Sequence, residues 1–408
     1  MNDNLRKYAD VLLNTCLKID KGQPLFISYN KERQEFVDII CELAKELGIE
    51  DIFLDKQDPY LKHDCLLKYS IDELKELPYW NKKDWDTYSK KNAAFLMLAS
   101  ETPGLMKDVD PDKLVEMTMY SLKTRKHFNE SRDKSLLAWC IAAVPTEAWA
   151  LEVFPNSKTP IEDLWNKIFE MCLLDQDYNN VWDQKIKKLK ERADKLNDYQ
   201  FKTLKYSSSN GTNFTVELPD NHLWATGYET LANGKEVLVN FPTEEIFTSP
   251  NKDSANGIVY NSKPLSYQDV LIDDFHIEFK DGKVINAHAE KGNDTLNNMI
   301  NICENSNMLG EVALVPNDSP ISNTNVVYLE TLFDENAACH LALGDSFPEC
   351  LSGSEGKTKD ELFELGLNKC DSHVDFMIGN KDLSIKGITK DNKEIDIFVN
   401  GNFSAYFD

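Results

Sequence analysis

Apolar residues in the first part of the chain alternate between helical stripes and short continuous runs. Residues 5–18 and 35–47 place apolar side chains every three or four positions, which is the spacing of an amphipathic helix. Residues 24–28 and 51–55 are short apolar runs, which are typical of buried strands. A strand, a helix and a second strand in this order need a crossover connection and therefore predict a parallel sheet.

Two later apolar runs, 93–98 and 136–144, extend this pattern, and a helix is predicted between them at 111–126. A stretch rich in Lys, Glu and Asp then predicts an exposed helix that leads to a domain boundary at residue 197. We therefore expect an open α/β domain over residues 1–197. No glycine-rich phosphate loop follows the first strand of this domain. This absence opposes one possible function, that of a nucleotide-using enzyme.

The pattern changes after residue 200, where turn signals separate short alternating segments. These signals are Asn210-Gly211, Asn233-Gly234, Asp281-Gly282 and Lys390-Asp391-Asn392. Only two helices are predicted here, at 294–304 and 359–367. The fold class is therefore α/β plus α+β, with a β-rich C-terminal domain over residues 198–408.

Groups suited to binding metal recur beside apolar runs of this second domain. Glu311 precedes a buried-looking segment, His340 lies inside another, and His373 is followed two positions later by Asp375. Positions i and i+2 of a strand share a face, so the last two side chains are expected to reach one centre. Taken singly, each residue has a plain structural alternative, a hydrogen-bonded core histidine or a carboxylate at the rim of a strand. Together with Glu244 and Glu245 upstream, they are the ligand types of a divalent metal site.

Composition narrows the classes of function. The net charge is −24, from 45 basic and 69 acidic residues, which opposes nucleic-acid binding. It favours solubility, or the attraction of cations. The nine cysteines form no close sequence pair, so we expect reduced thiols, with Cys339 a small core residue. With no leader-like N-terminus and no long apolar run, we expect a cytoplasmic protein without membrane contact.

Four long segments resemble the aminopeptidase T / aminopeptidase S family of metallopeptidases. They are NFPTEEIFTSP (240–250), LGEVALVPNDSPISNTN (309–325), LFDENAACHLALG (332–344) and SHVDFMIG (372–379), and WCIAAVPTEAWALEVFP (139–155) extends the likeness to the first half. The resemblance implies metal ligands at Glu245, Glu311, His340, His373 and Asp375. It implies a homodimer and the same two-domain fold, with the metals in the C-terminal domain.

One position departs from the family. Phe347 stands where the family has a tyrosine at the metal centre, and a phenyl ring can neither donate a hydrogen bond nor bind metal. Tyr406 is a candidate replacement for the missing phenol.

The function implied is a metal-dependent aminopeptidase that hydrolyses N-terminal residues from peptides through water activated by two divalent ions. Zn, Co and Mn suit these ligands comparably. Glu244 is the candidate general base, and the alternative places it on the opposite side of the strand from its ligand neighbour. A second interpretation is a metal- or peptide-binding homologue with weak or lost catalysis, because of Phe347.

Overall fold

The computed structural model describes residues 1–100, 102–268 and 270–407, and the chain forms two compact units. The N-terminal unit comprises residues 1–183 and 228–242, and the C-terminal unit comprises residues 184–227 and the chain from Thr243 onward. The sequence pattern predicts one boundary, at residue 197. The division instead falls inside the helix α10 (Tyr178–Tyr199), and residues 228–242 return to the N-terminal unit.

The N-terminal unit is built on a parallel sheet, as its strand–helix–strand pattern predicts. The sheet order is β10-β4-β3-β1-β2, and every neighbouring pair is parallel. The strands are β1 (Leu25–Asn30), β2 (Ile52–Gln57), β3 (Ala94–Ala99), β4 (Trp139–Ala143) and β10 (Asn240–Phe241). The hairpin β8 (Tyr228–Thr230) and β9 (Glu236–Leu238) also belongs to this unit.

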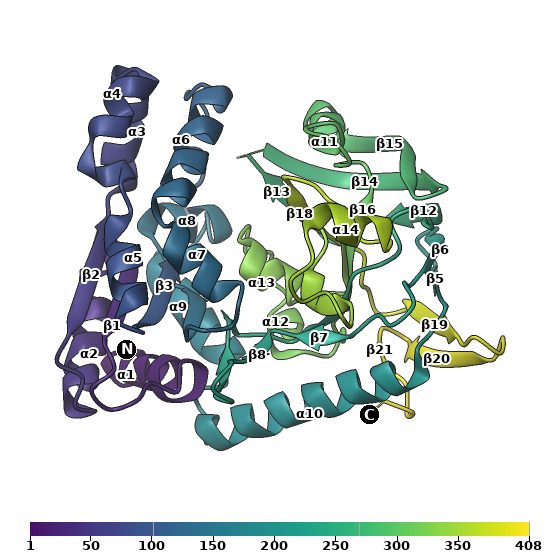
Figure 1. The fold of residues 1–408 in the computed structure, drawn as a ribbon, viewed down its shortest axis with the longest axis horizontal. Coiled ribbons are helices and arrows are strands. Elements are labelled where there is room, and N and C mark those ends of the chain that lie inside the picture. Colours follow the sequence, from purple (N-terminus) through teal and green to yellow (C-terminus); the bar gives the residue numbers. More distant parts are fainter. Residues whose placement is uncertain (101, 269, 408) are drawn as a thin grey trace. The chain divides into compact units, whose positions relative to one another are not determined.

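The first helix of the N-terminal unit precedes β1, and the other helices lie between successive parallel strands. They are α1 (Asn2–Asp10), α2 (Gln34–Glu46), α3 (Pro59–Lys68), α4 (Ile71–Glu76), α5 (Lys83–Lys90), α6 (Pro111–Thr124), α7 (Lys126–Arg132), α8 (Glu147–Val153) and α9 (Pro160–Met171). A π-helical turn, Val11–Cys16, continues α1. At the upper end of this unit in Figure 1, α3, α4 and α6 pack around a small cluster that includes Leu66, Leu74 and Met117.

The C-terminal unit is β-rich, as predicted, and its larger sheet has the order β13-β14-β12-β6-β5-β19-β20-β21, with β15 paired to β14. Its strands are β5 (Thr203–Ser207), β6 (Asn213–Glu217), β12 (Asn256–Tyr260), β13 (Leu265–Tyr267), β14 (Val270–Lys280), β15 (Lys283–Lys291), β19 (Ser384–Ile388), β20 (Glu394–Val399) and β21 (Asn402–Phe403). All four predicted turn signals connect antiparallel strands, three of them here and one in the hairpin β8–β9. The two predicted helices correspond to α11 (Asn293–Ile300) and α14 (Lys359–Glu364).

A second sheet of the C-terminal unit contains the run β18-β17-β16-β11-β7. These strands are β7 (Ala225–Thr226), β11 (Ile246–Thr248), β16 (Leu309–Leu314), β17 (His340–Gly344) and β18 (His373–Met377). One hydrophobic core joins the two sheets of this unit, because Leu204 and Ile277 of the larger sheet cluster with Val312, Leu341 and Phe376 of the smaller one. One face of β16, β17 and β18 is therefore buried in the core, and the other face is left for polar groups.

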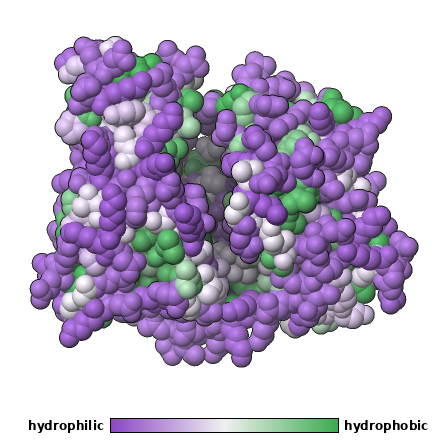
Figure 2. All heavy atoms as spheres, in the orientation of Figure 1, coloured by the Kyte–Doolittle hydropathy of each residue, from purple (hydrophilic) through white to green (hydrophobic). Residues whose placement is uncertain are grey.

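The visible face of the molecule is largely hydrophilic (Figure 2). Figure 2 shows hydrophilic side chains over most of the visible face, with hydrophobic residues in scattered patches. None of the described helices is both long and apolar enough to cross a membrane.

Candidate metal centre

Strand register brings the predicted ligands to one face of the smaller sheet. Glu311 pairs with Ala342, which pairs in turn with Asp375, so these residues form one row across β16, β17 and β18. His340 and His373 each lie two positions before a member of that row and therefore share its face. Glu245 immediately precedes β11, two positions before Phe247, which is aligned with Ala313 in the neighbouring row of the same face.

A bulge turns Glu311 away from the core. The register shifts between Leu309 and Glu311, so Leu309 packs in the core although it lies two positions before a residue of the polar face. Gly310 makes this bulge possible, because a Cβ atom there would lie 2.1 Å from the carbonyl oxygen of Asp345. The sequence LGE thus places a carboxylate on the polar face of an otherwise apolar strand.

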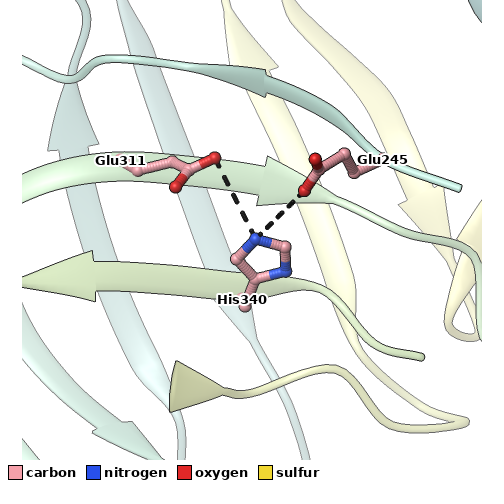
Figure 3. Close-up of side chains that lie close together, drawn as sticks. All are labelled: Glu245, Glu311 and His340. Atoms are coloured by element: carbon pink, nitrogen blue, oxygen red, sulfur yellow. Dashed lines mark ion pairs between the residues drawn. The ribbon is translucent and has the colours of Figure 1, made fainter. Parts of the chain in front are cut away.

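The first group of candidate ligands is deeply buried. Nε2 of His340 lies 3.4 Å from a carboxylate oxygen of Glu245 and 4.0 Å from one of Glu311. Figure 3 shows the three side chains, from three different segments, pointing toward one another. Their ligand atoms lie within 4.8 Å of one another, which is compact enough to surround one cation.

The second group shares Glu311 with the first. Nε2 of His373 lies 3.1 Å from Oε2 of Glu311 and 3.3 Å from Oδ1 of Asp375. His373 and Asp375 therefore face the same centre, as the strand alternation predicts, and Val374 between them packs against the core. Glu311 presents one oxygen to each group, Oε1 toward His340 and Oε2 toward His373.

Backbone carbonyls fix both imidazole rings in the orientation of a metal ligand. Nδ1 of His340 lies 3.1 Å from the carbonyl oxygen of Ala338, and Nδ1 of His373 lies 2.8 Å from that of Asp345. A carbonyl only accepts hydrogen bonds, so each Nδ1 is the donor and carries the proton. When a ring is neutral, its lone pair is therefore on Nε2, on the side of the carboxylates, where a cation among them could accept it. Ligating histidines are commonly oriented by such a hydrogen bond from the other ring nitrogen.

The electrostatics of the centre are those of a site that needs a cation. Burial raises the pKa of Glu311 to about 7, with Asp375 adding to the rise. Burial alone would lower the pKa of His340, but Glu245, Glu311 and Asp375 raise it to about 9. The residues therefore fit a divalent metal, since a buried excess of carboxylates is stabilised by a positive charge among them.

Glu244 has a different environment from its neighbour Glu245. It is buried, and its carboxylate lies 2.8 Å from Nζ of Lys185, on α10. Burial raises the pKa of Glu244, and Lys185 and Arg192 oppose the rise. Its backbone N–H donates to the side chain of Asn336 at 2.8 Å. This pairing favours the alternative in which Glu244 points away from the ligands, although it is buried rather than exposed.

One carboxylate near the centre is not among the residues that the sequence pattern predicts for the site. Glu335 is the last residue of α13 (Thr331–Glu335), and burial together with Asp375, Glu245 and Glu311 raises its pKa well above the usual value. Its Oε1 accepts a hydrogen bond from the side chain of Asn336 at 3.4 Å. The signal was present in LFDENAACH, where Glu335 lies five residues before His340, but that spacing matches no regular strand or helix face.

Phe347 lies at the centre, where the resemblance places it. Its ring is 5.0 Å from the ring of His373 and 5.2 Å from that of Phe247. Tyr406, the candidate replacement for the missing phenol, is 63% exposed, whereas Glu245, Glu311 and His340 are buried. The wall beside His373 is therefore aromatic and apolar.

Comparison with known proteins identifies the class of this chain. The family described as thermophilic metalloprotease (M29) matches residues 1–403. The chain is 37% identical to aminopeptidase 2 of Geobacillus stearothermophilus, over 98% of this chain and 97% of the relative. It is 34% identical to aminopeptidase AmpS of Bacillus subtilis (strain 168), over 99% of each. The solved structure of wild-type AmpT from Thermus thermophilus superposes with a TM-score of 0.91 at 28% identity, covering 99% of this chain and 100% of that one.

The chain therefore belongs to the M29 family of metalloproteases. The resemblance found in the sequence is confirmed, and with it the fold class and the enzyme class, a metallo-aminopeptidase.

Proposed function

We propose that this protein is an aminopeptidase that binds two divalent ions in the shared centre and removes N-terminal residues from peptides. The observation that carries the proposal is the pair of three-residue groups joined at Glu311. Glu245, Glu311 and His340 would hold one ion, and Glu311, His373 and Asp375 the other. A bridging carboxylate between two cations offsets their mutual repulsion, which suits the two-sided contacts of Glu311.

Bound ions supply a water of lowered pKa and polarise the peptide carbonyl. The residues of the chain perform the remaining tasks. The carboxylates of the centre attract the ammonium group of a peptide N-terminus, which favours attack on the first peptide bond. The phenyl ring of Phe347 packs beside the His373 ring and gives that side of the centre an apolar wall.

A proton acceptor is also needed, and two residues compete for this role. Glu244 is the prediction from sequence, but its carboxylate is paired with Lys185. The charges of Asp375, Glu245 and Glu311 act on the Glu335 carboxyl, which forms no ion pair with a basic side chain of the described residues. We therefore propose Glu335 as the group that takes the proton from the attacking water, with Glu244 retained as its rival.

The cofactors proposed are two ions of Zn, Co or Mn, because mixed imidazole and carboxylate ligands accept all three. The partners proposed are short peptides and a second copy of the chain, as a homodimer in the cytoplasm. Nucleic acid and membranes are not expected partners, given the net charge of −24.

A second candidate function follows from the place of Phe347. The ring of Phe347 lies 5.0 Å from the ring of His373 and lacks the hydroxyl of the family's tyrosine, so a metal-binding homologue with weak or lost catalysis is the alternative.

One experiment separates these functions. The protein is stripped of metal, Zn, Co or Mn is added back, and bound metal and the hydrolysis of a panel of aminoacyl amides are both measured. Glu311→Gln is the test variant, and Glu394→Gln, an exposed carboxylate on β20, is the matched control. Metal-dependent release of N-terminal residues, lost only in Glu311→Gln, supports the aminopeptidase.

Bound metal without hydrolysis supports the alternative, and restored hydrolysis in Phe347→Tyr would assign the loss to the missing phenol. A chain that binds none of the three metals contradicts the ligand assignment.

A further inference from the structure

Two thiols that are far apart in the sequence face each other beside the metal centre. Sγ of Cys303 and Sγ of Cys370 are 3.1 Å apart, which is about 1 Å longer than a disulfide bond. Cys303 lies in the turn after α11, and Cys370 lies in the loop between α14 and β18. The sequence does not indicate this pair, because 67 positions separate the two residues.

Hydrogen bonds on both sides of the thiols hold these two segments together. The side chain of Asn305 donates to the carbonyl oxygen of Lys369 at 3.1 Å, and the side chain of Asn368 donates to the carbonyl oxygen of Asn305 at 3.0 Å. The hydroxyl of Ser306 donates to the carbonyl oxygen of Cys303 at 2.7 Å and shapes the turn. The thiols therefore meet because their backbones are already aligned.

The two thiols differ in access to solvent. Cys303 is partly exposed, whereas Cys370 is 5% exposed. Burial raises the pKa of the Cys370 thiol to about 11. Cys303 is consequently the thiol that a small reagent reaches first, and Cys370 is placed to attack it afterwards.

A short path connects this pair to the metal centre through Asp345. The backbone N–H of Cys370 donates to Oδ1 of Asp345 at 3.1 Å, and the carbonyl oxygen of Asp345 accepts from Nδ1 of His373 at 2.8 Å. The N–H of Asp345 also donates to the carbonyl oxygen of Ser372 at 2.7 Å. A shift of the Cys370 backbone therefore acts on the residue that orients the His373 ring.

We propose that Cys303 and Cys370 are a redox-active dithiol that closes to a disulfide by exchange with a small-molecule disulfide, and that closure weakens metal binding at His373. The second half of this proposal rests on the proposed function, and the first half does not. Closure draws the sulfurs together by about 1 Å and strains the hydrogen bond between Cys370 and Asp345.

The exchange proceeds in two steps that balance. The Cys303 thiolate attacks one sulfur of the reagent RSSR, and RS⁻ leaves, which gives a mixed disulfide. The Cys370 thiolate then attacks Sγ of Cys303 and expels the second RS⁻. The two cysteine protons end on the two leaving thiolates, so one RSSR is reduced to two RSH and the dithiol is oxidised to one disulfide.

The test uses the full-length protein and oxidised glutathione as the reagent. We expect wild-type protein to lose the mass of two hydrogen atoms, to yield a peptide that joins Cys303 to Cys370, and to recover with dithiothreitol. In Cys370→Ser, glutathione should remain attached to Cys303. Cys41→Ser and Cys65→Ser, which remove the partly exposed thiols of the N-terminal unit, are matched controls that should still close the bond.

A stable glutathione adduct on wild-type Cys303, a cross-link elsewhere, or no reaction would overturn the dithiol. If Cys370→Ser does not fold, Cys303→Ser gives the same answer by leaving Cys370 unmodified.

The effect on the metal centre is measured separately, as zinc affinity in competition with a chromophoric chelator. We expect closure of the disulfide to weaken the zinc affinity by about 10-fold, which is the lower end of the effects of changing groups that orient a metal ligand. The zinc affinity of Cys303→Ser should not change when oxidised glutathione is added. Closure with unchanged affinity would overturn the coupling. A reduced protein that binds no zinc would instead contradict the proposed function and leave the disulfide result standing.

Discussion

The buried pair of Lys185 and Glu244 gives a sharp test of how the ligand segment is held. Lys185→Met leaves the Glu244 carboxylate, whose side chain is 5% exposed, without its ammonium partner. Breaking a buried ion pair costs about 3–5 kcal/mol, and we take about 3 because the Lys185 side chain is 24% exposed and water reaches it. The expected destabilisation is local, since Glu244 begins the segment that enters β11.

The destabilisation caused by Lys185→Met should become smaller as the solution is made more acidic. The pKa of Glu244 is raised by burial, so its stabilising contribution is complete below the ordinary carboxyl pKa and disappears as pH rises through the folded-state pKa. In Lys185→Met the opposing charge is gone and the folded-state pKa rises further. The variant should therefore approach the wild-type stability at acid pH and fall away from it toward neutral pH.

Hydrogen exchange followed by mass spectrometry measures this change in each unit. A cost of about 3 kcal/mol corresponds to amide exchange about 100-fold faster in peptides that span 243–248. Peptides of β1, in the N-terminal unit, are the internal control and should not change. The double variant Lys185→Met/Glu244→Gln should recover most of the protection, because no charge remains buried. Exchange accelerated by less than about threefold in Lys185→Met would refute the reasoning. A double variant whose amides exchange as fast as those of the single variant would refute it as well.

Three further predictions concern the metal centre. Glu335→Gln should lower turnover by about 10²–10⁴-fold with metal content unchanged, and Glu244→Gln should keep most of the turnover. The reverse pattern would identify Glu244 as the general base. Gly344→Ala should destabilise the protein by about 3 kcal/mol in urea unfolding, because φ is +114° and the new Cβ would lie 1.9 Å from a carbonyl oxygen. An unchanged free energy of unfolding would contradict the local geometry. Metal affinity should rise as pH increases through the pKa of Glu311, about 7, and that of His340, about 9, because bound ions replace the protons of these groups. A metal affinity that does not change with pH in chelator competition would show that these groups are not ligands.

Local patterns predicted the elements, because each depends on residues close in the sequence. The four turn signals correspond to hairpins in the structure. The i, i+2 spacing of His373 and Asp375 places Nε2 of the histidine 3.3 Å from Oδ1 of the aspartate. The unit boundary was less accessible, since residues 228–242 return to the N-terminal unit through β10, a strand of only Asn240–Phe241. Nothing in such a short segment indicates which sheet it joins.

Long-range geometry explains what local patterns could not show. The alignment of Glu311, Ala342 and Asp375 depends on the register of three strands and on one bulge. The opposite directions of Glu244 and Glu245 depend on Lys185 of a helix 59 positions earlier. Residue types and spacing picked out the candidate ligands. The family resemblance chose Glu245 over Glu244, because it compares residues position by position and does not need the register.

The same sheet explains why the polar centre is compatible with a stable fold. Along β16 and β17 the residues that alternate with the ligands, Val312, Leu341 and Leu343, lie in the hydrophobic core. The burial that raises the pKa of Glu311 is thus a direct consequence of the packing that holds its strand. Because the strands are fixed from the core side, the ligands cannot move apart to relieve their repulsion, and only protons or cations can neutralise them. A rigid core therefore preorganises an acidic cluster for metal, and divalent ions should stabilise the fold by the free energy of their binding.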